Sequence, residues 1–251
     1  MSQATIVQPG LDVRLPFYSV MSAICLGVAV LGFAPSFFLP LAQGTFVRPP
    51  VFYIHGLLFF GWTLYFCAQN WLVASRRVLP HREWGVLGAA IAAAMAFSVM
   101  SVVVVRLNQT PPVPAGPGSM TFAWVDVSGI VFFETCVVLA MMNTRNPEIH
   151  KRLMLLGTMS LLNAPIARWG AVLFGQHGGP PASFLEAQWF NLVAIALMLI
   201  PIGFDLRTRG KISRVYLLGV PIYALIDLTW PLVWSSPTWM RVAEAIKHIG
   251  G

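Results

Sequence analysis

Residues Arg145–Arg168, with the sequence RNPEIHKRLMLLGTMSLLNAPIAR, determine the fold of this chain. A turn and a charged cluster open the stretch, and they are formed by Asn146, Pro147, Glu148, His150, Lys151 and Arg152. In a helix of about 3.6 residues per turn, His150 and Arg168 lie on one face and are roughly 27 Å apart. That distance is close to the thickness of the hydrocarbon core of a bilayer, about 30 Å. The stretch therefore predicts a continuous transmembrane helix against which the other helices pack.

The composition indicates an integral membrane protein. Of the 251 residues, 57% are hydrophobic and 10% are charged, whereas soluble domains carry about 25% charged residues. The net charge of +7 resides in short loops between apolar runs, as the positive-inside rule describes. We therefore expect a lipid bilayer, and no nucleic acid, as the partner. The cysteines Cys25, Cys67 and Cys136 lie inside apolar runs, without the spacing of a disulfide framework or a zinc finger.

Apolar runs separated by short polar breaks predict an all-α bundle of seven transmembrane helices. The expected spans are 17–41, 50–74, 84–105, 121–142, 145–174, 186–204 and 215–234. They divide the chain into a cytoplasmic N-terminal tail (1–16), a seven-helix transmembrane domain (17–235) and a C-terminal surface tail (236–251). For the surface tail we expect a short amphipathic helix or a frayed terminus.

The distribution of basic residues predicts the orientation. Lysine and arginine concentrate after the second, fourth and sixth spans, at Arg76, Arg77, Arg82, Arg145, Lys151, Arg152, Arg207, Arg209, Lys211 and Arg214. The connections on the other side hold only Arg48 and Arg106. Because basic loops remain in the cytoplasm, we expect the N-terminus inside and the C-terminus outside, in a bacterial inner membrane.

Several polar residues fall within the expected spans. An ionisable group there costs about 2.5–3.5 kcal/mol on insertion scales and therefore needs a partner or a function. The expected directions of the spans gather six of these residues in the outer half or near the midplane, namely His55, Asp126, Glu134, Arg168, Asn191 and Asp227. We expect a buried ion pair between Arg168 and either Asp126 or Asp227. Such a pair could serve helix packing alone. Alternatively, it could belong to a proton path.

Two histidines lie at the inner boundary, at the same expected depth on different helices. A b-type haem needs two axial ligands arranged in this way, so His81 and His150 are candidate haem ligands. Three small residues on the faces of these histidines, Gly85, Gly88 and Gly157, would leave room for a macrocycle or would let helices pack closely. Alternatively, both histidines lie in the interface and contact phospholipid head groups beside Arg82, Lys151 and Arg152.

The motifs LPHREWG, from Leu79, and EIHKRLMLLGTMSLLNAPIARW, from Glu148, resemble those of a group of uncharacterised bacterial polytopic membrane proteins. Those proteins have an HRxxG turn and an HKRLM…R helix, and the resemblance covers most of the chain from His55 onward. The run DLRTRGKI resembles the last cytoplasmic loop of the group, although Ser213 stands where a histidine often appears. The resemblance implies a bacterial inner-membrane fold and no established activity. A looser similarity to cytochrome b561-like bundles rests only on histidines near helix ends.

Three functional hypotheses follow. The first is a small membrane redox protein that holds haem b through His81 and His150 and exchanges electrons with the quinone pool. The second is a non-catalytic accessory or assembly subunit of a larger membrane complex. The third is a transporter that moves a small polar solute through the outer polar residues. The chain contains no HExxH, GxSxG or Walker motif, so the enzyme classes that use these motifs are not indicated.

Overall fold

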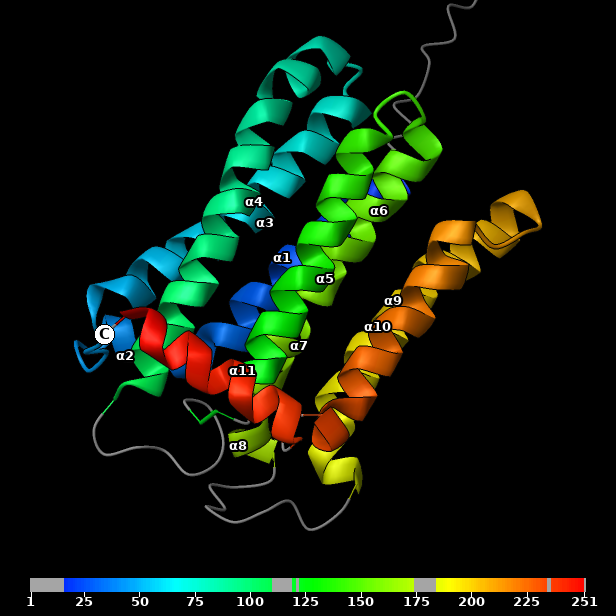
Figure 1. Ribbon diagram of the computed structural model, residues 1–251. Helices are drawn as coiled ribbons and strands as arrows, with labels where there is room; N and C mark the ends of the chain where they lie inside the picture. The colour runs from blue at the N-terminus through cyan, green and yellow to red at the C-terminus, as the bar shows by residue number, and fades with distance from the viewer. Residues whose placement is uncertain (1–15, 110–118, 121, 174–183, 234–235, 251) are drawn as a thin grey trace, which may run out of the picture.

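The computed structural model describes residues 16–109, 119–120, 122–173, 184–233 and 236–250. Within these residues the regular structure is helical (Figure 1). The elements are α1 (Phe17–Phe33), η1 (Ala34–Phe38), α2 (Leu39–Ala42), α3 (Pro50–Ala74), α4 (Val78–Leu107), α5 (Ala123–Met142), α6 (Pro147–Ser160), α7 (Asn163–Ala167), α8 (Gly170–Leu173), α9 (Phe184–Arg209), α10 (Arg214–Val233), α11 (Pro237–Lys247) and η2 (His248–Gly250). The expected N-terminal tail, 1–16, lies almost entirely outside the described residues.

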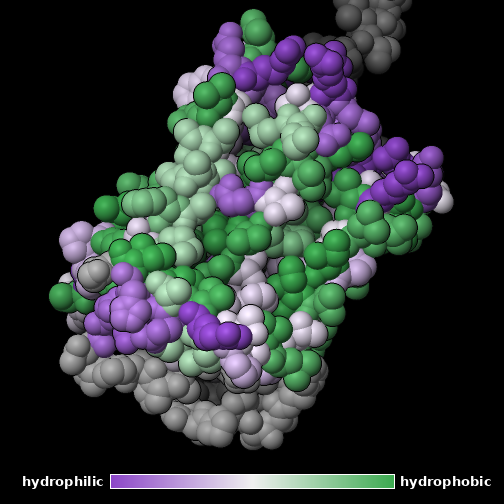
Figure 2. All heavy atoms as spheres, in the orientation of Figure 1, coloured by the Kyte–Doolittle hydropathy of each residue, from purple (hydrophilic) through white to green (hydrophobic). Residues whose placement is uncertain are grey.

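Six helical segments of the described chain are long and apolar enough to cross a membrane. They are Phe17–Ala42, Pro50–Ala74, Val78–Leu107, Ala123–Met142, Gln188–Arg209 and Arg214–Val233. This is the architecture of a multi-pass membrane protein. On the face shown in Figure 2, hydrophobic residues cover the middle of the bundle and hydrophilic residues gather near its ends.

The continuous helix that the sequence predicted over 145–174 does not form. Helix α6 is capped at its start, where the Asn146 side chain accepts a hydrogen bond from the backbone N–H of Ile149. It ends at Ser160, and α7 begins only at Asn163. The cause is Pro165, which has no N–H to donate to the carbonyl four residues earlier and whose ring clashes with that carbonyl. His150 and Arg168 are therefore not on one face of a single helix, and none of α6, α7 and α8 alone is among the six candidate spans.

Most of the packing is between helices that follow one another in the sequence and run antiparallel. The α3–α4, α5–α6 and α9–α10 turns lie at the same end of the bundle (Figure 1). We call this the basic end, because the ten lysines and arginines noted above lie in or next to these turns. The segments α6, α7 and α8 follow one another from the basic end towards the opposite end. Helices α2, α8 and α11 lie at that opposite end.

The C-terminal segment forms the amphipathic helix that the sequence suggested. Helix α11 lies across the ends of α4 and α5 (Figure 1). The Trp239 indole is buried and donates a hydrogen bond to the Met120 carbonyl at 2.8 Å. Asn108 donates to the Lys247 carbonyl at 3.0 Å. The buried face of the helix joins a core cluster with Trp62, Met95 and Phe133, so this segment is packed onto the bundle and is not frayed.

Candidate functional site

The structure brings His81 and His150 together. His81 lies in the first turn of α4 and His150 in the first turn of α6. Their ring centroids are 6.3 Å apart, and the ring planes are nearly perpendicular, at 83°. Because α4 and α6 are held on either side of α5 at the basic end (Figure 1), two imidazoles from distant parts of the sequence meet there.

The hydrogen bonds of these two rings leave ligand nitrogens available. His150 Nδ1 is 2.8 Å from the Ala140 carbonyl. A carbonyl only accepts, so Nδ1 must carry the proton, and the neutral ring keeps a lone pair on Nε2. His81 Nδ1 is buried and has no hydrogen-bond partner among the described residues. One imidazole of the pair is therefore anchored by a backbone carbonyl, and the other has a buried nitrogen without a partner among the described residues.

Two of the three glycines near these histidines serve helix packing instead of leaving room for a macrocycle. A Cβ on Gly88 would come within 2.7 Å of the Tyr65 ring, and a Cβ on Gly157 would lie 2.9 Å from the Cys136 Cβ. Only Gly85 has no atom within 4 Å of its Cβ position. The close-packing alternative therefore holds for Gly88 and Gly157, because α3 and α5 fill the space that they leave.

A buried ion pair that the sequence analysis missed lies at the same end. Arg152, in α6, is 1% exposed and Asp205, in α9, is 0% exposed. Arg152 Nε donates to Asp205 Oδ2 at 2.9 Å, and its Nη2 donates to Asp205 Oδ1. The backbone N–H of Ser213 also donates to Asp205 Oδ2, at 3.3 Å. The guanidinium of Arg152 is therefore satisfied inside the bundle, by Asp205 and by Glu148.

Glu148 extends this pair to the surface of the basic end. Its carboxylate accepts hydrogen bonds from Lys151 at 2.5 Å, Arg152 at 2.6 Å and Arg209 at 3.1 Å. The bonds from Lys151 and then Arg152 lower the pKa of Glu148 to about 2. Glu148 is thus ionised at neutral pH, and it forms ion pairs with three basic side chains, those of Lys151, Arg152 and Arg209. This network joins α6 to the end of α9.

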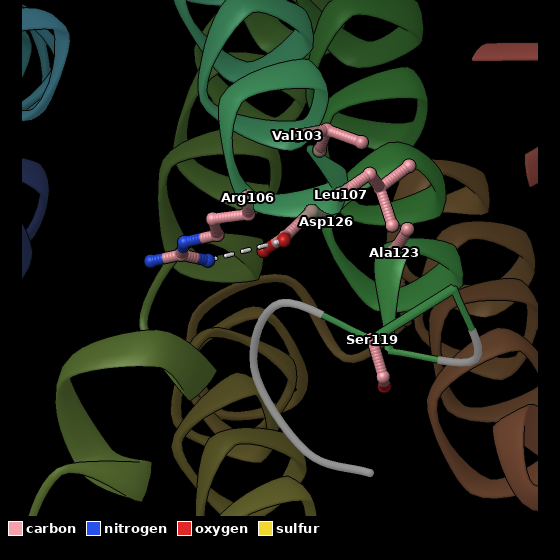
Figure 3. A pocket seen from close by; sticks show the side chains of 6 residues that line it. All are labelled: Val103, Arg106, Leu107, Ser119, Ala123 and Asp126. Carbon is pink, nitrogen blue, oxygen red and sulfur yellow. Dashed lines mark hydrogen bonds and ion pairs between the residues drawn. The ribbon is translucent and has the colours of Figure 1, made fainter. Parts of the chain in front are cut away.

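The expected outer ion pair of Arg168 does not form. Asp126 pairs instead with Arg106, whose Nη1 is 3.3 Å from Asp126 Oδ2 (Figure 3). The Arg168 guanidinium carbon lies 5.4 Å from the centre of the Phe33 ring. Within the described part of the chain, Arg168 has no salt bridge to any carboxylate. The pairing was expected from similar depth in the membrane, and depth does not determine side-chain direction, which the interruption before Asn163 changes.

His55 and Glu134 form no ion pair with any residue that the structure describes. His55 is half-buried, with Nδ1 3.3 Å from the Ser98 hydroxyl and its ring against Phe59. Glu134 Oε1 is buried and unpaired among the described residues. The recess beside the Arg106–Asp126 pair is lined by Val103, Arg106, Leu107, Ser119, Ala123 and Asp126 (Figure 3). This recess is too narrow to hold a water molecule.

Asp227 has a different set of neighbours from Asp126. It is 7% exposed, and Asn163 Nδ2 lies 3.3 Å from its Oδ2. Asn191 is 1% exposed and donates to the Asp227 backbone carbonyl at 3.0 Å. The structure thus brings two of the six outer residues, Asp227 and Asn191, into contact, together with Asn163. The sequence signal for this contact was Pro165, which ends the preceding helix and places Asn163 at the start of the next.

Similarity to known proteins gives no indication of the function. Comparison of the chain with protein-family models, with curated proteins and with solved structures found no match. In the described residues no group of three or more histidine, cysteine, aspartate or glutamate side chains is placed to hold a metal ion.

Proposed function

We propose that this protein is a small membrane redox protein in which His81 and His150 are the axial ligands of a b-type haem at the basic end. The observation that carries the proposal is the 6.3 Å separation of the two ring centroids. With metal–nitrogen bonds of about 2 Å, two imidazoles on one metal ion place their ring centroids roughly 6 Å apart. The separation of the two rings therefore matches the one that a shared iron would require.

The residues around the two rings fit a ligand role. The Ala140 carbonyl fixes the tautomer of His150 and leaves Nε2 as the donor atom. His81 carries a buried ring nitrogen without a partner, which is costly unless something occupies it. Gly85, one turn after His81, leaves open space where a side chain would stand. When bound, the haem would carry single electrons.

The proposal places the protein in a bacterial inner membrane, with quinone as its electron-exchange partner. A quinone dissolves in the hydrocarbon core, and the exposed hydrophobic residues on the long helices put the bundle in contact with that solvent. An accessory subunit would need no cofactor. The two alternatives therefore differ in whether the purified protein contains haem.

The absorption spectrum of the detergent-purified protein tests the proposal. We expect a sharp α-band in the reduced-minus-oxidised spectrum and one haem per chain by pyridine haemochrome. His81→Ala and His150→Ala should each abolish the band, because the iron loses an axial ligand. His55→Ala is the matched control, since His55 is a half-buried histidine bonded to Ser98 and should leave the band unchanged.

A colourless protein from haem-replete cells would overturn the redox proposal and leave the accessory role. A band that survives both His81→Ala and His150→Ala would assign the haem to other residues. His248, 73% exposed on its side chain, provides a second control, because His248→Ala changes only the surface.

We further infer that the chain crosses the membrane seven times, with the N-terminus inside and the C-terminus outside. The support is that α6, α7 and α8 together lead from the basic end towards the opposite end (Figure 1). Three short helices in series can cross a bilayer where protein covers their interrupted backbone. The positive-inside rule then places the basic end in the cytoplasm.

Cysteine labelling tests this topology. In a chain with Cys25, Cys67 and Cys136 replaced, Gln43→Cys lies between α2 and α3, and Lys211→Cys lies between α9 and α10. With seven crossings, a membrane-impermeant maleimide should label Gln43→Cys in intact cells and Lys211→Cys only after permeabilisation. If α6–α8 does not cross, both positions lie on the same side and react alike. Labelling of Lys211→Cys alone from outside would reverse the orientation.

A further inference from the structure

The interruption between α6 and α7 faces a buried polar group of side chains. We call this group the interior polar site; it consists of Asn163, Gln188, Asn191, Tyr223 and Asp227. It is built from α7, α9 and α10, and α9 packs on both of the other helices. The Tyr223 hydroxyl donates to the Ser160 carbonyl at 3.4 Å, where the break leaves a carbonyl without its usual helical partner.

Asp227 is the only acidic residue of the interior polar site, and its neighbours are all uncharged. Asn163 faces it from α7, Asn191 from α9 and Tyr223 from one turn earlier on α10. Helix α5 presents Phe132 to this region, with its ring 5.4 Å from that of Tyr223. No lysine, arginine or histidine of the described chain forms an ion pair with Asp227.

Asp227 thus lacks the basic partner that each of the other two described aspartates has. Asp126 pairs with Arg106, and Asp205 pairs with Arg152. An ionised carboxylate inside a bilayer without a counter-charge is strongly disfavoured, so such a group takes up a proton or binds a cation. Asp227 has one carboxylate and amide neighbours, which suits a proton better than a metal ion that prefers several anionic ligands.

Two further polar atoms of the interior polar site are buried without partners in the described residues. They are Gln188 Nε2 and Asn191 Oδ1, on side chains that are 0% and 1% exposed. Asn191 Nδ2 donates both to Gln188 Oε1 and to the Asp227 carbonyl, so the amide orientation is determined by its bonds. A free donor and a free acceptor within one buried polar group are what a bridging water would bind.

We propose that Asp227 is a proton-binding group inside the membrane, held as a neutral carboxylic acid and able to exchange its proton with water. On release, the carboxyl O–H bond breaks, its electron pair remains on the Asp227 oxygen and the proton passes to a water molecule. Asn163 then stabilises the carboxylate through the bond from Nδ2 to Oδ2. The proposal does not depend on haem binding, because neither His81 nor His150 belongs to this site.

Infrared spectroscopy tests the proposal in the full-length protein in detergent. Isotopic labelling of the side-chain carboxyl carbon of aspartate shifts the C=O band of aspartic acid. The shift distinguishes it from the bands of glutamic acid residues such as Glu134. At neutral pH we expect the C=O band of a protonated aspartic acid, which disappears reversibly when the pH is raised. Asp227→Asn should remove this band. Asp126→Asn is the matched control and should retain it, since Asp126 is ion-paired.

Asn163→Ala gives a second test that keeps the carboxyl group. The protonated-carboxyl band should remain but move to higher wavenumber, because the hydrogen bond to Oδ2 is lost. The absence of a protonated aspartate band in the parent protein would overturn the proposal, as would a band that persists in Asp227→Asn. A band that vanishes on addition of sodium at constant pH would instead assign the site to a metal cation. Each outcome is read from the carboxyl itself, whether or not a chromophore is bound.

Discussion

Replacing Arg152 by alanine is expected to lower the free energy of unfolding by about 3–5 kcal/mol, because the change leaves a buried charge on Asp205 without its partner. Asp205 is fully buried and accepts two hydrogen bonds from the guanidinium. The remaining donor to this carboxylate is the backbone of Ser213, at 3.3 Å. Unfolding of the detergent-solubilised protein by added SDS, followed by circular dichroism, measures the loss.

Removing both charges together should be much less harmful. In the double variant Arg152→Met with Asp205→Leu, no charge is left uncompensated, and apolar side chains of similar size fill the space. Such replacements of buried ion pairs are often neutral or stabilising. We therefore expect the double variant to recover most of the stability that the single variant loses. If the double variant is as unstable as Arg152→Ala, the pair has a role beyond mutual compensation.

The Arg106–Asp126 pair provides the matched control. Its side chains are 21% and 27% exposed, so water can solvate either charge when its partner is removed. Pairs with access to solvent contribute about 0–1 kcal/mol, and Arg106→Ala should cost no more than that. Equal losses in Arg152→Ala and Arg106→Ala would contradict the difference in burial on which this prediction rests.

The sequence predicted the long spans because hydrophobic length is a local property. The expected span 50–74 has the bounds of α3, and the expected span 121–142 ends at the same residue as α5. Helix α9 continues to Arg209, five residues past the expected end of its span. Arginine side chains can extend away from apolar surface to reach water, so a helix need not end where its charged residues begin.

The sequence could not predict the ion pairs, because each joins residues far apart in the chain. Asp205 was placed in a cytoplasmic loop, although the extension of α9 brings it beside Arg152 inside the bundle. Arg106 was assigned to a connection and proved to be the partner of Asp126. A proline such as Pro165 is a usual cause of a kink, but its consequence for the direction of Arg168 depends on how α7 packs on its neighbours.

Helices α1 and α7 are in close contact at Gly32, so a larger residue there is expected to lower the stability of the protein. Gly32→Ala should lower the free energy of unfolding by about 1–3 kcal/mol, the usual cost of adding atoms to a filled site. A Cβ on Gly32 would lie 2.6 Å from the Pro165 carbonyl oxygen, closer than van der Waals contact allows. Backbone atoms cannot rotate away as a side chain can, so α1 and α7 would have to separate. SDS unfolding measures the cost as for Arg152→Ala.

Gly27→Ala is the matched control on the same helix, since no atom lies within 4 Å of its Cβ position. Alanine favours a helix over glycine by up to about 1 kcal/mol, so Gly27→Ala should leave the protein equally or slightly more stable. A loss in Gly27→Ala as large as in Gly32→Ala would mean that contact with Pro165 is not the cause. Displacement of α7 should also weaken the bond from Asn163 to Asp227, so Gly32→Ala is expected to shift the carboxyl band of Asp227 in the same direction as Asn163→Ala.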